Sequence, residues 1–206
     1  MSDFAVQVFA RPPIAGQAKT RLISALGAQG AARVYEELLR TTVDRLAGAF
    51  GGALSLWVSG EPNHPVFQTL AAEHSLLIQS QEGADLGERM SLALRTGLER
   101  QDKVILVGSD CPPMDADYVK QALAALDAGA DCVLGPAEDG GYVLVGLRKW
   151  GPQPFMDIPW GSAQVLAKTR ERLRQAGWHW RELHPLWDLD RPEDLSRWRL
   201  LHEVTP

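Results

Sequence analysis

The sequence is poor in the features that mark several classes of protein. Its 206 residues include only two cysteines, Cys111 and Cys132, too few for a disulfide framework in a chain of this length. No apolar run approaches the roughly 20 residues that span a bilayer, and the first residues lack the basic start and apolar stretch of a signal peptide. We therefore expect a cytoplasmic protein with two buried thiols.

An excess of positive charge is also lacking. The 21 Lys and Arg residues are outnumbered by 26 Asp and Glu residues, which gives a formal net charge of −5. This balance predicts neither nucleic acid nor an anionic membrane as a partner. The phosphates of a small substrate would have to be met by a local group of cations. The five histidines show none of the paired spacings of a zinc site.

Short apolar runs alternate with helical stretches along the chain. Helical periodicity predicts helices over residues 29–46, 85–98, 117–126, 163–175 and from Pro192 onward. Strands are expected at 4–9, 54–58, 76–78, 104–107, 132–134, 142–145 and 178–183. Such alternation favours the α/β class, with a mostly parallel sheet between helical layers. No repeat or linker interrupts the pattern, so we expect a single domain, residues 1–206.

A basic loop follows the first predicted strand. Residues 4–35 contain no acidic side chain, whereas Arg11, Lys19, Arg21 and Arg33 are all basic. In open α/β sheets, ligands bind where loops leave the carboxyl ends of strands. Arg and Lys can hold phosphate oxygens there, and Gly16 would let backbone N–H groups approach them. A solvated loop that only turns the chain explains the pattern about as well, because the P-loop and dinucleotide-binding spacings are both absent.

Two separated aspartates form a candidate metal site. Asp110 directly follows the fully apolar strand at 104–107, at the end where a carboxylate can hold Mg²⁺ beside substrate phosphates. Asp190 lies in the acidic segment 187–195. There a purely structural explanation competes, because Asp190 and Glu193 have the spacing of a helix capping box around Pro192. The nearby Asp188 has no such local explanation.

A glycine pair joins two of the predicted strands. Asp139, Gly140 and Gly141 are ordinary hairpin residues, and that role alone would account for them. Two glycines beside carboxylates also suit a loop that a substrate approaches closely.

Six segments occur in the same order in a known family. They include Gly-Ser-Asp-Cys-Pro, Ile-Pro-Trp-Gly and Trp-Asp-Leu-Asp-Arg-Pro-Glu-Asp-Leu, and together they cover residues 9–22, 85–90, 108–112, 135–142, 158–161 and 187–195. The chain thus resembles the radical-SAM/selenodomain-associated transferases, often labelled glycosyltransferases, of the nucleotide-diphospho-sugar transferase (GT-A) superfamily. It is more distantly similar to 2-phospholactate guanylyltransferases and molybdenum-cofactor nucleotidyltransferases. The resemblance implies a three-layer α/β/α sandwich with a mostly parallel mixed sheet.

The resemblance also implies roles for residues within the matching segments. It makes Lys19 and Asp110 the main catalytic candidates, with Arg11, Gly16, Lys19 and Arg21 around the nucleotide phosphates. Asp110 and Asp190 would hold Mg²⁺ or Mn²⁺. Asp85 and Arg89 would lie near the base or ribose, whereas Asp139, Gly140 and Gly141 would face the acceptor.

Three functions remain open at this stage. The donor is either a nucleoside triphosphate, in nucleotidyl transfer, or a nucleotide-sugar, in glycosyl transfer, and the acceptor is a small molecule. Many GT-A glycosyltransferases carry Asp-x-Asp, whereas this chain has Ser109-Asp110-Cys111 with one carboxylate. The third function is a non-catalytic nucleotide-binding module. A shared metal ion requires Asp110 and Asp190 to lie within about 10 Å of each other, unless a hinge closes the gap.

Overall fold

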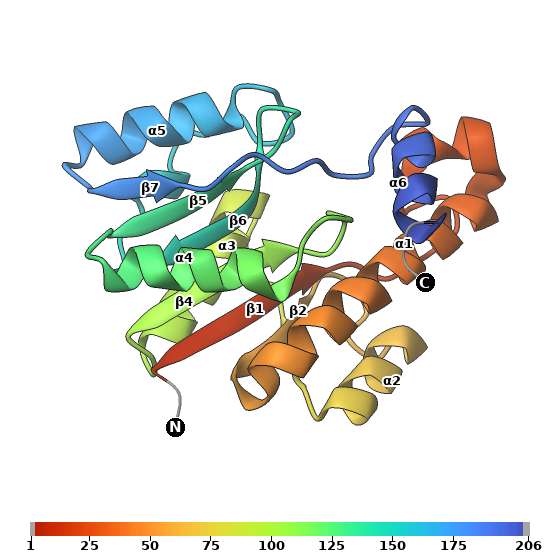
Figure 1. Cartoon of the computed structure of the whole chain (residues 1–206), viewed down its shortest axis with the longest axis horizontal. Helices are drawn as coiled ribbons and strands as arrows, with labels where there is room; N and C mark the ends of the chain where they lie inside the picture. Colours follow the sequence, from red (N-terminus) through yellow and green to blue (C-terminus); the bar gives the residue numbers. More distant parts are fainter. Residues whose placement is uncertain (1–2, 204–206) are drawn as a thin grey trace.

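The computed structural model describes residues 3–203 and, for side chains, residues up to 201. Seven strands form one sheet in the order β3-β2-β1-β4-β6-β5-β7. The strands are β1 (Phe4–Ala10), β2 (Leu54–Val58), β3 (Leu77–Ser80), β4 (Lys103–Gly108), β5 (Cys132–Pro136), β6 (Tyr142–Leu147) and β7 (Trp180–Glu182). The α-helices are α1 (Ile23–Phe50), α2 (Pro65–His74), α3 (Leu86–Leu98), α4 (Ala116–Asp127), α5 (Val165–Gln175) and α6 (Asp194–Glu203). Figure 1 shows the helices stacked on both sides of the sheet.

The sheet is parallel except at β6. Strand β1 pairs in parallel with β2 and β4, β2 with β3, and β5 with β7, whereas β6 runs antiparallel to β4 and β5. The sequence therefore predicted the class correctly as a mainly parallel mixed α/β sheet. Because β6 alone is reversed, it begins at the edge where the parallel strands end.

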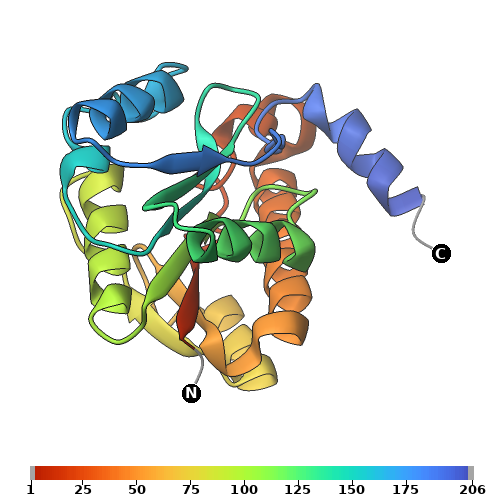
Figure 2. The same ribbon diagram turned by 60° about the vertical axis from the view of Figure 1, so that its left-hand side comes forward.

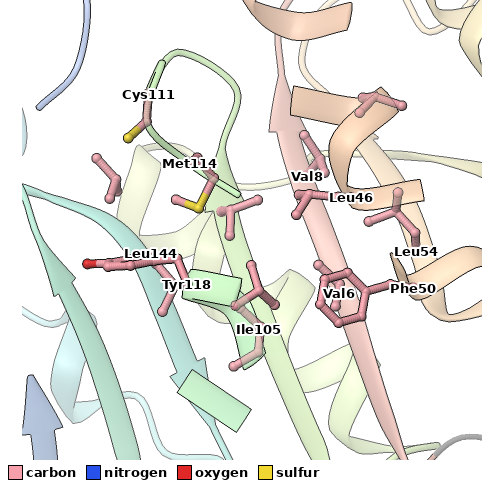
Figure 3. Close-up of a cluster of buried hydrophobic side chains, with 14 of the residues drawn as sticks. Val6, Val8, Leu46, Phe50, Leu54, Ile105, Cys111, Met114, Tyr118 and Leu144 are labelled. Carbon is pink, nitrogen blue, oxygen red and sulfur yellow. The ribbon is translucent and has the colours of Figure 1, made fainter. Parts of the chain in front are cut away.

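Alternate residues of the central strands face two separate cores. Val6 and Val8 of β1 pack with helices α1, α2 and α4, as does Ile105 of β4. Part of this first core is drawn in Figure 3, where the side chains of α1 meet those of β1. Phe9 and Leu106 face the opposite side, where α3 and α5 cover the sheet. Apolar side chains at consecutive positions are needed because both faces of these strands are buried.

The last part of the chain crosses back over the carboxyl edge of the sheet. After β7 it reaches the beginning of α1, where Trp187, Leu189 and Leu195 pack against Leu22 and Leu38. Figure 2 shows α6 beyond this crossing, directed away from the sheet. The crossing brings the acidic segment 187–195 beside the basic loop, which lies about 170 positions earlier in the sequence.

Most predicted elements are confirmed, with boundaries that differ by a few residues. The largest differences are helix α2, which the periodicity did not reveal, and α1, which is longer than predicted and has a non-helical backbone at Gly27, φ +69°. Strand β3 begins one residue later than expected and continues to Ser80. Both cysteines are free and buried. Among the described residues, no helix is long and apolar enough to cross a membrane.

The predicted capping box around Asp190 and Glu193 was wrong. Helix α6 begins only at Asp194. The Asp194 carboxylate accepts hydrogen bonds from the backbone N–H groups of Asp190 at 3.0 Å and Arg191 at 2.7 Å. Asp194 thus stabilises the turn, and the competing structural role no longer accounts for the carboxylate of Asp190.

Candidate active site at the carboxyl edge of the sheet

Loops from both halves of the chain converge at the carboxyl edge of the sheet. The basic loop follows β1, Ser109 and Asp110 follow β4, and the hairpin 137–141 leads into the reversed β6. The C-terminal segment is tied to them by backbone hydrogen bonds, from Leu186 N to Pro136 O and from Leu189 N to Asp110 O, both 3.0 Å. Residues that are distant in sequence therefore lie side by side.

Lys19 lies between the two candidate metal ligands. Its Nζ is 2.9 Å from Asp110 Oδ2 and 3.7 Å from Asp190 Oδ1. Because both carboxylate oxygens lie within 3.7 Å of the same nitrogen, Asp110 and Asp190 are well within the separation of about 10 Å that a shared metal ion allows. The Lys19 side chain is only 5% exposed, against 38% for Asp110 and 31% for Asp190. Lys19 also has a left-handed backbone, φ 47°, which is rare for a residue with a Cβ and often marks a functional site.

Charge pairing outweighs burial in this cluster. Burial opposes ionisation of Asp110, but the positive charge of Lys19 and its hydrogen bond lower the pKa of this carboxyl. Burial also opposes the charged form of Lys19, yet Asp110 and Asp190 together raise the pKa of its ammonium group. Lys19 and Asp110 are therefore both ionised at neutral pH.

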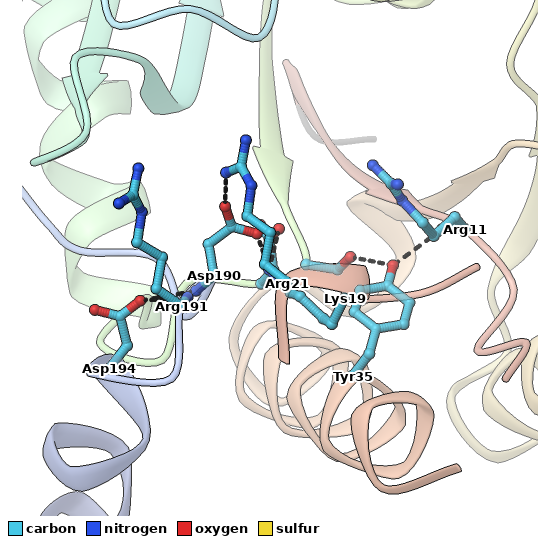
Figure 4. Close-up of polar contacts among 9 residues, drawn as sticks. Arg11, Lys19, Arg21, Tyr35, Asp190, Arg191 and Asp194 are labelled. Carbon is cyan, nitrogen blue, oxygen red and sulfur yellow. Dashed lines mark hydrogen bonds and ion pairs between the residues drawn. The ribbon is translucent and has the colours of Figure 1, made fainter. Parts of the chain in front are cut away.

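Further cations surround the pair of aspartates. The Arg21 guanidinium bonds to Asp190 Oδ2, as Figure 4 shows, and the side chain of Arg191 extends nearby. Arg11 forms no ion pair with any described residue, and its charge contributes to the low pKa of Asp110. Its backbone N–H donates to Tyr35 Oη at 3.0 Å, and Tyr35 Oη lies 2.8 Å from Ser109 Oγ. These bonds link the basic loop to the start of the Asp110 loop.

Asp188 is a further carboxylate of this cluster. It is half-buried, and burial together with the nearby charges of Asp110 and Asp139 raises its pKa to about 6. The sequence left its role open because no local motif explained it. Asp188 is thus close enough to Asp110 and Asp139 for their negative charges to oppose its ionisation, a repulsion that a cation would relieve.

Two adjoining cavities extend from the cluster. The smaller one, about 260 Å³, is lined by Arg11, Gln17, Lys19, Thr20, Arg21, Tyr35, Asp110 and Asp190. The larger one, about 510 Å³, shares Arg11, Gln17, Tyr35 and Asp110 with it and runs past Gln81, Leu86, Arg89 and Met90. Cations line the first, whereas the second is a larger and more apolar hollow lined by residues of β1, β4, β6 and α3. Together they have the dimensions and chemistry of a nucleotide site.

Several predicted site residues lie outside both cavities. Gly16 only turns the basic loop, with φ +83°. The Asp85 carboxylate caps α3 by accepting from Glu88 N at 2.8 Å, so of the two residues expected near the base or ribose only Arg89 lines the cavity. Asp139 Oδ1 accepts from Gly141 N at 2.8 Å, the bond of a tight turn. This turn matches the ordinary hairpin role of these residues.

Close contacts with residues 159–163, which begin with the Pro-Trp-Gly turn, explain why two positions are glycine. A Cβ on Gly140 would lie 2.3 Å from the carbonyl oxygen of Ala163, and a Cβ on Gly87 would lie 2.5 Å from Trp160 Nε1. The ring of Trp160 also packs edge-on against Tyr142, which lines the larger cavity. The turn therefore braces the helix and the hairpin that flank this cavity, and Gly140 is required by packing.

The residues at this edge fit a divalent cation that also binds substrate. Within the described part of the chain, no group of three or more His, Cys, Asp or Glu residues is arranged to hold a metal. Asp110 and Asp190 are oxygen donors that share one cation, Lys19. Mg²⁺ is commonly held by one or two carboxylates and completed by phosphate oxygens and water. The donor set is of this kind.

A cation-lined hollow beside two carboxylates, at the carboxyl edge of such a sheet, is the arrangement of a nucleotide-dependent transferase with a three-layer α/β/α fold. The chain belongs to the family described as "Uncharacterized protein conserved in bacteria (DUF2064)", which matches residues 42–162. It is 31% identical over 184 residues to 3-phospho-D-glycerate guanylyltransferase of Phenylobacterium zucineum (strain HLK1), covering 86% of this chain and 82% of the relative. The protein is an enzyme of the transferase class.

Solved structures agree with this fold. A crystal structure from Desulfovibrio desulfuricans G20, named for nucleotide-diphospho-sugar transferases, is 30% identical, with a TM-score of 0.83 and coverage of 98% of this chain and 95% of that chain. Glucosyl-3-phosphoglycerate synthase from Mycobacterium tuberculosis, in complex with Mg²⁺ and uridine-diphosphate, is 14% identical. Its TM-score is 0.57, and the match covers 94% of this chain and 73% of that one. These comparisons support the predicted resemblance to the nucleotide-diphospho-sugar transferase superfamily. The association with radical-SAM/selenodomain proteins stays a prediction.

Proposed function

We propose that this protein is a divalent-metal-dependent nucleotidyltransferase that transfers a nucleoside monophosphate from a nucleoside triphosphate to a small, phosphate-bearing acceptor. The observation that carries the proposal is the Lys19 ammonium shared by Asp110 and Asp190 in the smaller cavity, which adjoins the larger one. The relative from P. zucineum is named a guanylyltransferase of 3-phospho-D-glycerate. We therefore take GTP as the donor and a phosphoglycerate-like molecule as the acceptor.

The residues of the cluster have separable tasks. Asp110 and Asp190 would hold Mg²⁺ or Mn²⁺, which supplies electrostatic stabilisation of the leaving phosphate when bound. Lys19 and Arg21, now paired with these carboxylates, would turn to the triphosphate as its oxygens arrive. Arg11 has no carboxylate partner to give up, so its guanidinium is available for the donor.

The chemistry then depends mainly on positioning. An oxygen of the acceptor phosphate attacks the α-phosphorus of the donor, the bond from that phosphorus to the bridging oxygen breaks, and pyrophosphate leaves with the electron pair. The attacking oxygen is already ionised at neutral pH, so this step requires no general base. The protein has to neutralise the triphosphate and hold the two reactants in line.

The test is a turnover assay on the full chain. GTP, 3-phosphoglycerate and Mg²⁺ should give pyrophosphate and a guanylylated product, and EDTA should stop the reaction. Release of a nucleoside diphosphate from a nucleotide-sugar, with no pyrophosphate from any nucleoside triphosphate, would favour glycosyl transfer instead. Binding of nucleotides without turnover, across a panel of phosphorylated acceptors, would favour the non-catalytic module.

A further inference from the structure

Gln81 has its side-chain amide fixed at the carboxyl edge of the sheet. The residue follows β3 and lines the larger cavity. Its Nε2 donates two hydrogen bonds, to Trp57 O at 2.9 Å and to Ala10 O at 3.1 Å. The side chain therefore lies across the ends of β2 and β1, and both of its N–H hydrogens are used.

These two partners determine which way the amide faces. Both are carbonyl oxygens, which can only accept, so the NH₂ group and not the carbonyl must point at them. Rotating the amide by 180° would place Oε1 against two other oxygens and lose both hydrogen bonds. Within the described part of the chain, no group donates to Gln81 Oε1. The side chain of this cavity-lining residue thus keeps one unused polar atom, an acceptor whose orientation is fixed.

We propose that Gln81 Oε1 reads the guanine base of the donor, accepting from the ring N1–H and the 2-amino group. This inference rests on the proposed function, in which GTP occupies the cavity. Guanine presents two adjacent donors on this edge, and one carbonyl oxygen can reach both. Adenine presents the lone pair of its unprotonated N1 at the matching position, which a fixed acceptor repels.

The surroundings of Gln81 suit a flat base. Leu86, Met90 and Leu106 contribute apolar side chains to the same cavity, so a ring can lie against them while its edge meets the amide. A glutamine that could rotate would serve either purine, because its donor and acceptor ends exchange. The two strand carbonyls prevent that exchange, and this is what makes the residue selective.

The experiment compares the binding of GTP, ITP and ATP by calorimetry in the presence of Mg²⁺. ITP is guanosine triphosphate without the 2-amino group, so it removes one of the two donors. Wild-type protein should bind GTP about tenfold more tightly than ITP, and ATP more weakly still. Gln81→Met, which keeps the length but has no acceptor, should bring the GTP-to-ITP ratio to within about threefold of one.

A second variant controls for the possibility that Gln81→Met does not fold. Gln81→Lys keeps a donor for the carbonyls of Trp57 and Ala10 while it replaces the acceptor by a positive charge, so it should abolish the preference for GTP over ATP. Gln79→Met, two residues earlier on β3 but exposed and outside the cavity lining, is the matched control and should retain the wild-type ratios. Wild-type ratios in both folded Gln81 variants, or a wild-type preference for ATP, would overturn the inference.

Measuring nucleotide binding and turnover separately distinguishes a failure of this inference from a failure of the proposed function. Selective GTP binding that depends on Gln81, without transfer to any phosphorylated acceptor, would leave the base reading in place and remove the transferase proposal. Guanylyl transfer with unchanged selectivity in Gln81→Met would do the reverse. A wild-type protein that binds none of the three nucleotides would overturn both.

Discussion

The two ends of the sheet carry similar ion clusters, yet only the carboxyl end has the features of an active site. At the carboxyl end, Lys19 contacts Asp110 and Asp190. At the amino end, Lys103 contacts Asp3 at 2.8 Å and Asp127 at 2.5 Å, and its side chain is 11% exposed. A hollow of about 750 Å³ also lies at the amino end. Neither a buried lysine between two aspartates nor a large cavity is therefore enough to identify a site.

The difference lies in which charges are already neutralised. Around the amino-end hollow, Lys149 pairs with Asp131 at 2.9 Å, and Arg95 lies 3.7 Å from Glu99. Around the carboxyl end, Arg11 forms no ion pair with a described residue, and Asp188 has a raised pKa. The basic side chains that line the amino-end hollow are thus all paired with carboxylates, whereas Arg11 at the carboxyl end keeps a positive charge for a ligand that brings a negative one.

We expect the largest effect from a substitution of Asp110, which breaks the carboxyl-end cluster. Asp110→Asn should lower kcat/KM for nucleotide transfer by at least about a hundredfold, because one of the two proposed metal ligands loses its charge. The melting temperature should fall by a few degrees, since Asn keeps the shape of the side chain but loses the ion pair with Lys19. Asp127→Asn at the amino end is the control and should retain full activity. Steady-state kinetics would contradict the assignment if the two variants were equally active.

The two lysines should differ in binding rather than in folding. Lys19→Met should weaken nucleotide affinity about tenfold or more through loss of a charge-assisted contact to phosphate. It should also strengthen the binding of Mg²⁺ alone, because no ammonium then competes for Asp110 and Asp190. Lys103→Met should alter neither affinity. Equal nucleotide affinities for both variants in calorimetry would remove Lys19 from the phosphate site.

Asp190 and Asp194 allow the same contrast within one segment. Because Asp194 stabilises the turn before α6, Asp194→Ala should destabilise the fold by about 1 kcal/mol. Asp190→Asn should leave stability nearly unchanged and remove metal-dependent nucleotide binding. Thermal unfolding and calorimetry on both variants provide the check. A Asp190→Asn variant with normal Mg²⁺-dependent binding would leave Asp110 without its proposed partner.

The smallest effect concerns pH. The pKa of Asp188 is raised to about 6, so stability linked to its neutral form is present below its ordinary pKa and lost as pH rises through 6. Burial opposes ionisation of Asp131, but Lys149 and His179 N–H lower its pKa, so its contribution has the opposite sign and is lost as pH falls. In metal-free buffer, Asp188→Asn should melt a few degrees above wild type at pH 8, with the gain vanishing near pH 4.

Asp131→Asn is the counterpart at the amino end. It should melt below wild type at pH 8, and the deficit should shrink as the pH falls. Melting curves of both variants between pH 4 and 8 test the opposed signs. Parallel pH profiles for the two variants would show that the ends of the sheet do not differ electrostatically.

Local patterns predicted the fold well because the elements are periodic and capped. The apolar run at 104–107 and the helix start at Asp85 were both found with nearly correct boundaries. Helix α2 was missed because it is only ten residues long and begins with a proline and a histidine cap instead of a common capping residue. The misassigned cap at Asp190 shows the opposite failure, since a good local motif gave way to the hydrogen bond that Asp194 Oδ2 accepts from Asp190 N–H.

The site was predictable only where a charged residue stood out in the sequence. Asp110 and Lys19 did so, and the structure brings them together. Gln81 could have been suspected only from its position after a strand, because the two carbonyls that fix it belong to other strands. The same holds for Asp188, whose neighbours lie on distant loops. Side-chain chemistry can be inferred from sequence, but its orientation depends on tertiary neighbours.

The crossing of the C-terminal segment has a consequence for the order in which the protein becomes active during synthesis. Both cavities are lined almost entirely by residues before 146, and Asp190 is the only later residue that lines either one. In a nascent chain, the residues that line the larger cavity can therefore have emerged from the ribosome while Asp190, the proposed second acidic ligand, is still within it. Catalytic competence would begin only when the segment around Leu189 has emerged and bonded to Asp110.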